Sequence, residues 1–355
     1  MGLAVSRATC QSAVTERQCL LAGLVWWARN KAGHRDFMKL RNAAWSIFGL
    51  AAVVVSGFIL YREFRRISFA AVADSLAAIS LHNWFLAVLA TLCAYGALAW
   101  YDRIAIAHLG KKISWLFISL CSFTTYALSH NIGASVISGA VVRYRAYSTR
   151  GLTVQDIGIL IVFCSFTFAL GTVLMGGLVL VIEPQLVHRF FDLPLAVAFV
   201  VGAVLLLLVA LYVYGSWRHL PPWSFYGFSV HYPRLPIVAR QLLAGPLEIA
   251  SAAAIIYFAL PAAGNPGYLM VLGIFLASFS LALLSHAPGG LGVLEVTFLS
   301  AMPEMNPNDV LAALIVFRLL FLLIPFAISL VIVLIFERLQ FGRDSGESGG
   351  HGSKV

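Results

Sequence analysis

The sequence contains few charged residues. Only 11% of its 355 residues are Asp, Glu, Lys or Arg, whereas 61% are hydrophobic. A soluble domain of this length carries about a quarter charged residues, so the sequence indicates an integral membrane protein. The net charge of +9 does not indicate a nucleic-acid-binding protein. The basic residues are scattered at the ends of apolar runs, where they can meet anionic lipid head groups.

Patterns typical of metal, redox or ATP chemistry are also lacking. The chain has five cysteines without close ligand spacing, and three of them lie inside apolar runs, which indicates buried small side chains. No phosphate-cradling Walker pattern is present, so direct use of ATP is not expected. The pairs Ser129-His130 and Ser285-His286 are too close in sequence to form meaningful catalytic dyads. We therefore expect no catalytic residue, no metal and no cofactor.

Long apolar runs dominate what remains. A helix needs about 20 apolar residues to cross a bilayer, and lipid favours helices wherever such runs are continuous. The sequence therefore predicts an all-α, polytopic helical bundle with about eight transmembrane helices. We place them near Ala43–Tyr61, Trp84–Ile106, Ser114–Leu128, Ile157–Ile182, Leu193–Tyr214, Ile237–Leu260, Tyr268–Leu284 and Val310–Phe336.

The distribution of polar residues predicts three regions. Residues 1–42 are basic and read as a disordered cytoplasmic extension without a cleavable signal pattern. Residues 43–339 form the transmembrane domain. Residues 340–355 are a polar tail rich in Gly and Ser, expected to be disordered.

Two stretches break the apolar pattern. "LSHNIGASVISGAVVRYR" (Leu128–Arg145) and "LLSHAPGGLGVLE" (Leu283–Glu295) each begin with Leu-Ser-His at the end of an apolar run, 156 positions apart. Paired broken helices in corresponding halves of a chain are typical of transport sites. We therefore predict two re-entrant or broken-helix regions that form an internal repeat; the alternative is a pair of ordinary interfacial loops.

Charged residues inside the predicted helices are candidate functional groups. Glu248, Glu295 and Arg318 lie in spans where an ionised group costs about 2.5–3.5 kcal/mol, so each should face the interior and find a partner. Glu295 and Arg318 are candidates for one another. A purely structural ion pair is the alternative to a functional one.

Polar groups at the two breaks complete the candidate set. Arg143 and Arg145 suit phosphate through their planar guanidinium groups, although they could simply extend toward lipid head groups. A glycine-rich turn that opens a helix offers free N–H groups to an anion. The remaining candidates at the breaks are His130, Asn131, His286, Gly289 and Gly290.

Three motifs in this order resemble a known family. "YALSHNIGASVISGAVVRYRAYSTRGLTVQDIGILIVFCSFTFALG" (Tyr126–Gly171), "LLSHAPGGLGVLEVTFL" (Leu283–Leu299) and "ALIVFRLLFLLIPFAISL" (Ala313–Leu330) look like the flippase portion of bacterial lysylphosphatidylglycerol synthetase/flippases, the multiple peptide resistance factors. The resemblance covers roughly residues 40–339. In that family the membrane bundle is thought to move an aminoacylated phospholipid between leaflets, and a separate soluble domain charges the lipid.

The resemblance implies a stand-alone flippase-like module of the bacterial inner membrane. The chain reaches Val355 soon after its last apolar run, so we expect no synthetase activity. Lysylphosphatidylglycerol carries a phosphate and two amines. Arg143, Arg145 and the glycine turn would then bind the phosphate, and Glu248 and Glu295 the ammonium.

Several alternatives remain at this stage. The chain could carry another anionic or isoprenoid-phosphate lipid, act chemically on a lipid, or partner a separately encoded lipid aminoacyltransferase. The expected partners are a phospholipid substrate and the membrane, with no nucleic acid, and a homodimer is possible.

Overall fold

The computed structural model describes most of the chain after residue 68. The chain divides into two units, residues 1–54 and 55–355, and every described residue belongs to the second unit. The predicted extension 1–42 and the predicted first span, 43–61, lie outside the described residues. The described ranges are 69–132, 135–191, 193–218, 223–225, 228–230, 232–285 and 290–348.

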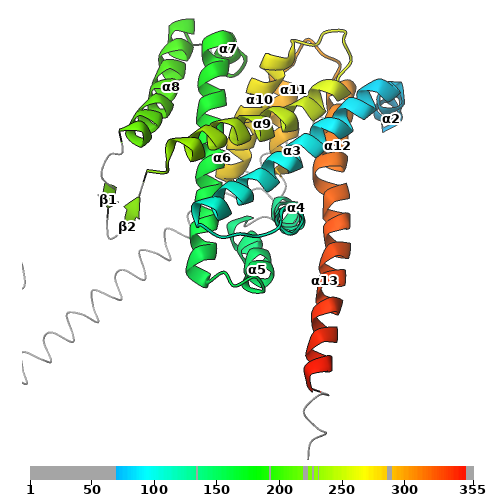
Figure 1. Ribbon diagram of the computed structural model, residues 1–355. Coiled ribbons are helices and arrows are strands. Elements are labelled where there is room, and N and C mark those ends of the chain that lie inside the picture. Colours follow the sequence, from blue (N-terminus) through cyan, green and yellow to red (C-terminus); the bar gives the residue numbers. More distant parts are fainter. Residues whose placement is uncertain are drawn as a thin grey trace, which may run out of the picture. The chain divides into compact units, whose positions relative to one another are not determined.

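Helices make up nearly all of the described chain, which confirms the all-α prediction (Figure 1). A short antiparallel hairpin, β1 (Trp223–Phe225) and β2 (Phe228–Val230), lies between α8 and α9. The helices are α2 (Phe69–Ala78), α3 (Leu81–His108), α4 (Trp115–Ile132), α5 (Ser135–Ser148), α6 (Val154–Ile182), α7 (Leu186–Phe190), α8 (Leu195–Trp217), α9 (Leu235–Ala259), α10 (Tyr268–Ser285), α11 (Val293–Ala301), α12 (Pro307–Phe317), the π-helical segment η2 (Arg318–Leu323) and α13 (Ile324–Ser348).

Five helical segments of the described chain are long and apolar enough to cross a membrane. They are α3, α6, α8, α9 and the continuous run from α12 through η2 into α13, and each coincides with a predicted span. The chain is therefore a multi-pass membrane protein. The helix α13 reaches Ser348, so residues 340–348 of the predicted tail are helical, and residues 349–355 lie outside the described residues.

The other two predicted spans in the described chain, α4 and α10, are shorter and belong to helical hairpins. Helix α5 packs along α4, and a Cβ added to Gly139 would lie 2.8 Å from Ser129 Oγ and 3.2 Å from Thr125 Cγ2. The chain thus reverses direction between residues 132 and 135. Helices α10 and α11 also pack together, and Gly290 lies beside Ala282. Both predicted broken-helix regions are hairpins of this kind.

The order of elements repeats along the chain. A long helix, a hairpin and a second long helix occur first as α3, α4–α5 and α6, and then as α9, α10–α11 and α12–η2–α13. The single long helix α8 lies between the two sets. Figure 1 shows α3 and α9 side by side and running in opposite directions, and these two helices pack extensively. The repeat predicted from two Ser-His pairs therefore extends to whole elements, in the inverted arrangement common among transporters.

Small residues bring the two sets into close contact at the crossing of α6 and α9. A Cβ on Gly171 would lie 2.7 Å from the backbone of Gly245, so both positions require glycine. One helical turn earlier on each helix, Gln241 Nε2 donates to Thr167 Oγ1 at 2.9 Å. Close backbone approach and interhelical hydrogen bonds are what hold helices together in lipid.

A proline explains the π-helical segment in the last span. Pro325 has no N–H, so the carbonyl of Phe321 loses its usual partner four residues later. The N–H of Ile324 instead bonds to the carbonyl of Leu319, five residues back. The freed Phe321 carbonyl accepts from the Tyr95 hydroxyl of α3 at 2.9 Å. Helix-breaking residues are tolerated in membranes when neighbouring helices satisfy the freed backbone groups in this way.

Candidate functional site

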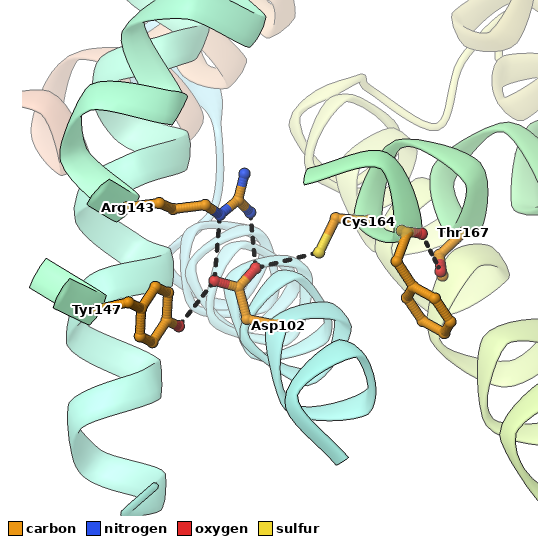
Figure 2. Close-up of polar contacts among 6 residues, drawn as sticks. Asp102, Arg143, Tyr147, Cys164 and Thr167 are labelled. Carbon is orange, nitrogen blue, oxygen red and sulfur yellow. Dashed lines mark hydrogen bonds and ion pairs between the residues drawn. The ribbon is translucent and has the colours of Figure 1, made fainter. Parts of the chain in front are cut away.

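Asp102 anchors a buried polar network among α3, α5 and α6. Its side chain is fully buried, and Arg143 Nη2 lies 2.6 Å from Asp102 Oδ1. The Tyr147 hydroxyl donates to Oδ2 at 2.9 Å, and Cys164 Sγ lies 3.3 Å from Oδ1 (Figure 2). Arg143 and Tyr147 are one turn apart on α5, so both donate to the Asp102 carboxylate from the same face of this helix. The network therefore holds a charge of each sign with its partners inside the bundle.

The two arginines predicted to bind phosphate, Arg143 and Arg145, lie in different environments. The Arg143 guanidinium is buried, is occupied by Asp102, and lies 5.0 Å from the centre of the Tyr126 ring. Arg145 is exposed. The two arginines therefore point into different environments, and only Arg143 belongs to the buried network.

Sequence reasoning missed Asp102. The signal that singled out Glu248 and Glu295, an ionisable residue inside an apolar run, applies equally to Asp102 within the predicted span 84–106. Its place near the end of that span, next to Arg103, resembles an interfacial pair. In the structure the two neighbours lie on different faces of α3, since Asp102 is buried and Arg103 is exposed.

A second ion pair inside the bundle joins the second hairpin to η2. Arg318, the first residue of η2, contacts Glu295 Oε1 through Nη2 at 2.6 Å and Nε at 2.8 Å, so the predicted pairing is confirmed. Glu295 lies in the first turn of α11, and its other oxygen accepts from the Gly292 N–H at 2.9 Å. Arg318 also reaches the Gly290 carbonyl at 3.4 Å. Gly290 and Gly292 have φ values of +63° and +80°, which explains why this turn uses glycine.

Glu248 is a buried carboxylate in the middle of α9. The residue is 6% exposed, and its Oε2 atom has no hydrogen-bond partner among the described residues. The Tyr101 hydroxyl of α3 is close enough to this carboxylate to interact with it electrostatically. This hydroxyl also lacks a well-formed hydrogen bond in the described chain. A buried carboxylate without a counter-ion is costly, so such groups in membranes usually mark a pathway or binding site.

The end of the first hairpin's α4 packs on η2. Asn131 Nδ2 donates to the Leu322 carbonyl at 3.1 Å, and the His130 ring stacks on the Phe321 ring with centres 5.4 Å apart. The His130 Nδ1 atom has no partner among the described residues. Asn131 thus joins the first hairpin to a carbonyl of the distorted segment.

Both hairpins therefore reach η2, one helical turn apart. The second hairpin binds Arg318 through Glu295, and the first contacts Phe321 and Leu322 through His130 and Asn131. The predicted ligands His286 and Gly289 lie outside the described residues. The structure thus connects five of the predicted residues, which are His130, Asn131, Gly290, Glu295 and Arg318.

Comparison with known proteins places the chain in a family. Residues 46–329 match the family described as lysylphosphatidylglycerol synthase TM region. The chain belongs to this family. The match includes both hairpins and the Asp102–Arg143 and Glu295–Arg318 pairs, and the resemblance inferred from the three motifs is confirmed at this level.

Two relatives match most of the length of the chain. "Uncharacterized protein slr0712" of Synechocystis is 27% identical over 266 residues, which is 74% of this chain and 82% of the relative. "Inner membrane protein YbhN" of Escherichia coli is 26% identical over 243 residues, which is 67% of this chain and 74% of the relative.

Proposed function

We propose that this chain is a flippase-like carrier of the bacterial inner membrane that moves lysylphosphatidylglycerol or a related phospholipid between leaflets. The observation that carries the proposal is the meeting of two helical hairpins on η2, where a buried Glu295 pairs with a partly buried Arg318. The family name and the inner-membrane relative are consistent with this location and substrate class.

The head group of such a lipid matches the charges of the site. Its phosphate needs cationic or N–H donors, which Arg318 and, once Glu295 is displaced, the Gly292 N–H provide, and its amines need carboxylates. In the resting state Glu295 neutralises Arg318, so neither charge is left unpaired in the membrane. The phosphate of an incoming lipid competes for Arg318, and its amine competes for Glu295. Binding therefore replaces the Arg318–Glu295 pair with two pairs, phosphate–Arg318 and ammonium–Glu295.

Glu248 has a separate role in this proposal. Because it lies on α9 and lacks a counter-ion among the described residues, it offers the ammonium group of the lipid a partner without breaking an existing pair. Arg143, by contrast, stabilises the first repeat through Asp102, and its contribution to binding is indirect.

Transport in proteoliposomes tests this function. The purified full chain is reconstituted with mass-labelled lysylphosphatidylglycerol in one leaflet, and appearance of the lipid in the other leaflet is followed. We expect Glu248→Gln, Glu295→Gln and Arg318→Gln each to slow movement at least about tenfold, as loss of one buried charge–charge interaction implies. The matched control is Arg218→Gln, which changes an exposed basic residue at the end of α8.

The outcomes separate the alternatives. Wild-type rates in all three variants would contradict the proposal. Equal movement of phosphatidylglycerol and its lysyl form would instead indicate a carrier of anionic lipids in general, and competition by an isoprenoid phosphate would indicate that substrate. The proposal includes no aminoacyl transfer. Newly aminoacylated lipid formed by the purified chain with charged transfer RNA would contradict that part.

A further inference from the structure

A cavity of about 630 Å³ lies at the end of α3, on another face of this helix from the Asp102 network. Its basic lining residues are Arg103 of α3, Lys111 and Lys112 of the following loop, and Arg240 near the start of α9. Trp100 contributes to its apolar wall. The cavity thus combines four cations with a partly apolar surface.

The cations of this cavity have few anionic partners of their own. Lys111 lies 3.5 Å from Asp156, and Arg103 donates weakly to the Ile113 carbonyl at 3.4 Å. Lys112 and Arg240 form no ion pair among the described residues. Four positive side chains around one concavity repel one another, and a phosphate group relieves that repulsion through charge-assisted hydrogen bonds.

The surroundings of the cavity favour a lipid over a soluble phosphate. On α9, Leu243 and Leu247 follow Arg240 by three and seven residues, so they continue along the same face, and they are 62% and 44% exposed. On α3, the exposed Leu92 and the half-buried Trp100 lie on the face that leads to Arg103. Apolar stripes that end in basic residues fit acyl chains in the bilayer and a phosphate at its boundary.

We propose that this cavity binds the phosphodiester head group of an anionic phospholipid at the membrane surface. Its acyl chains lie along the exposed faces of α3 and α9. The site is distinct from η2 and does not depend on the proposed transport activity. An anionic lipid is preferred over a zwitterionic one because, within the described chain, the four cations have one carboxylate partner, Asp156, which pairs with Lys111.

Native mass spectrometry of the full chain in detergent tests this site. Phosphatidylglycerol and phosphatidylcholine with the same acyl chains are titrated separately. We expect Lys112→Gln and Arg240→Gln each to weaken phosphatidylglycerol binding about fivefold, and the double variant about 25-fold, from the typical contribution of one basic residue near a lipid surface. Both side chains are exposed, so the variants should fold; unchanged unfolding temperatures verify this.

The control variant and a soluble competitor complete the experiment. Arg218→Gln, outside the cavity, should bind phosphatidylglycerol as the wild type does, and none of these variants should change phosphatidylcholine binding. Glycerol 3-phosphate should displace the lipid only weakly. The proposal is overturned if the double variant retains wild-type binding, if both lipids bind equally, or if glycerol 3-phosphate alone binds as tightly as the lipid, which would indicate a soluble phosphate ligand.

Discussion

At the scale of single residues, buried charges in this chain fall into two kinds. Asp102 and Glu295 each have an arginine partner and further donors. Glu248 has an oxygen without a hydrogen-bond partner among the described residues. Paired charges contribute to one defined structure, whereas an unpaired carboxylate is available to a ligand. This difference separates residues expected to affect stability from those expected to affect transport.

The Asp102–Arg143 pair should behave as a structural unit. We expect Asp102→Asn to lower the free energy of unfolding by about 3–5 kcal/mol, because Arg143 is left as a buried cation without its counter-ion. The double variant Asp102→Leu with Arg143→Met removes both charges and should recover part of this loss. Thermal loss of monodisperse protein in detergent measures both. A double variant less stable than Asp102→Asn would contradict this account.

The sequence alone identifies the charged residues within apolar stretches, but it does not identify the ion-pair partner of each. Glu295 and Arg318 could be matched in advance because they are oppositely charged residues in otherwise apolar stretches of the sequence. The role of Asp102 depends on α5 folding back along α4, which brings Arg143 and Tyr147 to it from 41 and 45 residues away. Such a contact depends on the reversal of the chain and leaves no local spacing signal.

At the scale of helices, close crossings and one distorted segment position the site. Gly171 of α6 and Gly158, which lies more than three turns earlier on the same helix, differ in their surroundings. A Cβ at Gly171 would meet the Gly245 backbone at 2.7 Å, whereas nothing lies within 4 Å of one at Gly158. The two glycines are therefore a matched pair for testing the α6–α9 crossing.

We expect opposite effects of alanine at these two positions. Gly171→Ala should destabilise the protein by about 1–3 kcal/mol, since the backbones must move apart. Gly158→Ala should be neutral or stabilise by up to about 1 kcal/mol, through the higher helix propensity of alanine. Unfolding temperatures in detergent measure the difference. Equal values for the two variants would show that the crossing is looser than described.

The π-helical segment gives a second prediction at this scale. Pro325→Ala restores an N–H that can bond to the Phe321 carbonyl, in competition with the Tyr95 hydroxyl. The π-helical segment holds one more residue than the same length of regular α-helix. If it becomes α-helical, Arg318 should rotate by about 100° relative to α13 and lose its contact with Glu295. We expect at least about tenfold slower lipid movement in proteoliposomes.

A control for this variant lies in the same span. Pro307 occupies the first turn of α12, where a missing N–H costs nothing. Pro307→Ala should therefore leave lipid movement unchanged. Wild-type movement in Pro325→Ala would mean that the π-helical segment does not set the position of Arg318.

The location of the spans was predictable, because hydropathy alone determines where long helices form in lipid. The two hairpins were also indicated, by Ser-His pairs and glycines in apolar runs. The predicted spans 114–128 and 268–284 correspond to α4 and α10, which are shorter than the five long segments and each belong to a hairpin. The polar residues Ser129, His130 and Asn131 end α4, and the chain then returns as α5.

At the scale of the whole molecule, two repeats of opposite direction meet at η2. The first hairpin supplies His130 and Asn131, the second supplies Glu295, and the last span supplies the segment that both contact. No local sequence feature predicts this meeting. One contact at this segment can be traced to Pro325, which frees the Phe321 carbonyl that the Tyr95 hydroxyl of α3 then satisfies.

A structure of the full chain in lipid nanodiscs, with and without lysylphosphatidylglycerol, tests the central claim most directly. The account predicts that added lipid places its phosphate within hydrogen-bonding distance of Arg318 and the Gly290–Gly292 turn, with the Arg318–Glu295 contact lengthened and an amine beside Glu248 or Glu295. An unchanged 2.6 Å contact between Arg318 and Glu295, with the lipid bound elsewhere on the protein, would contradict it.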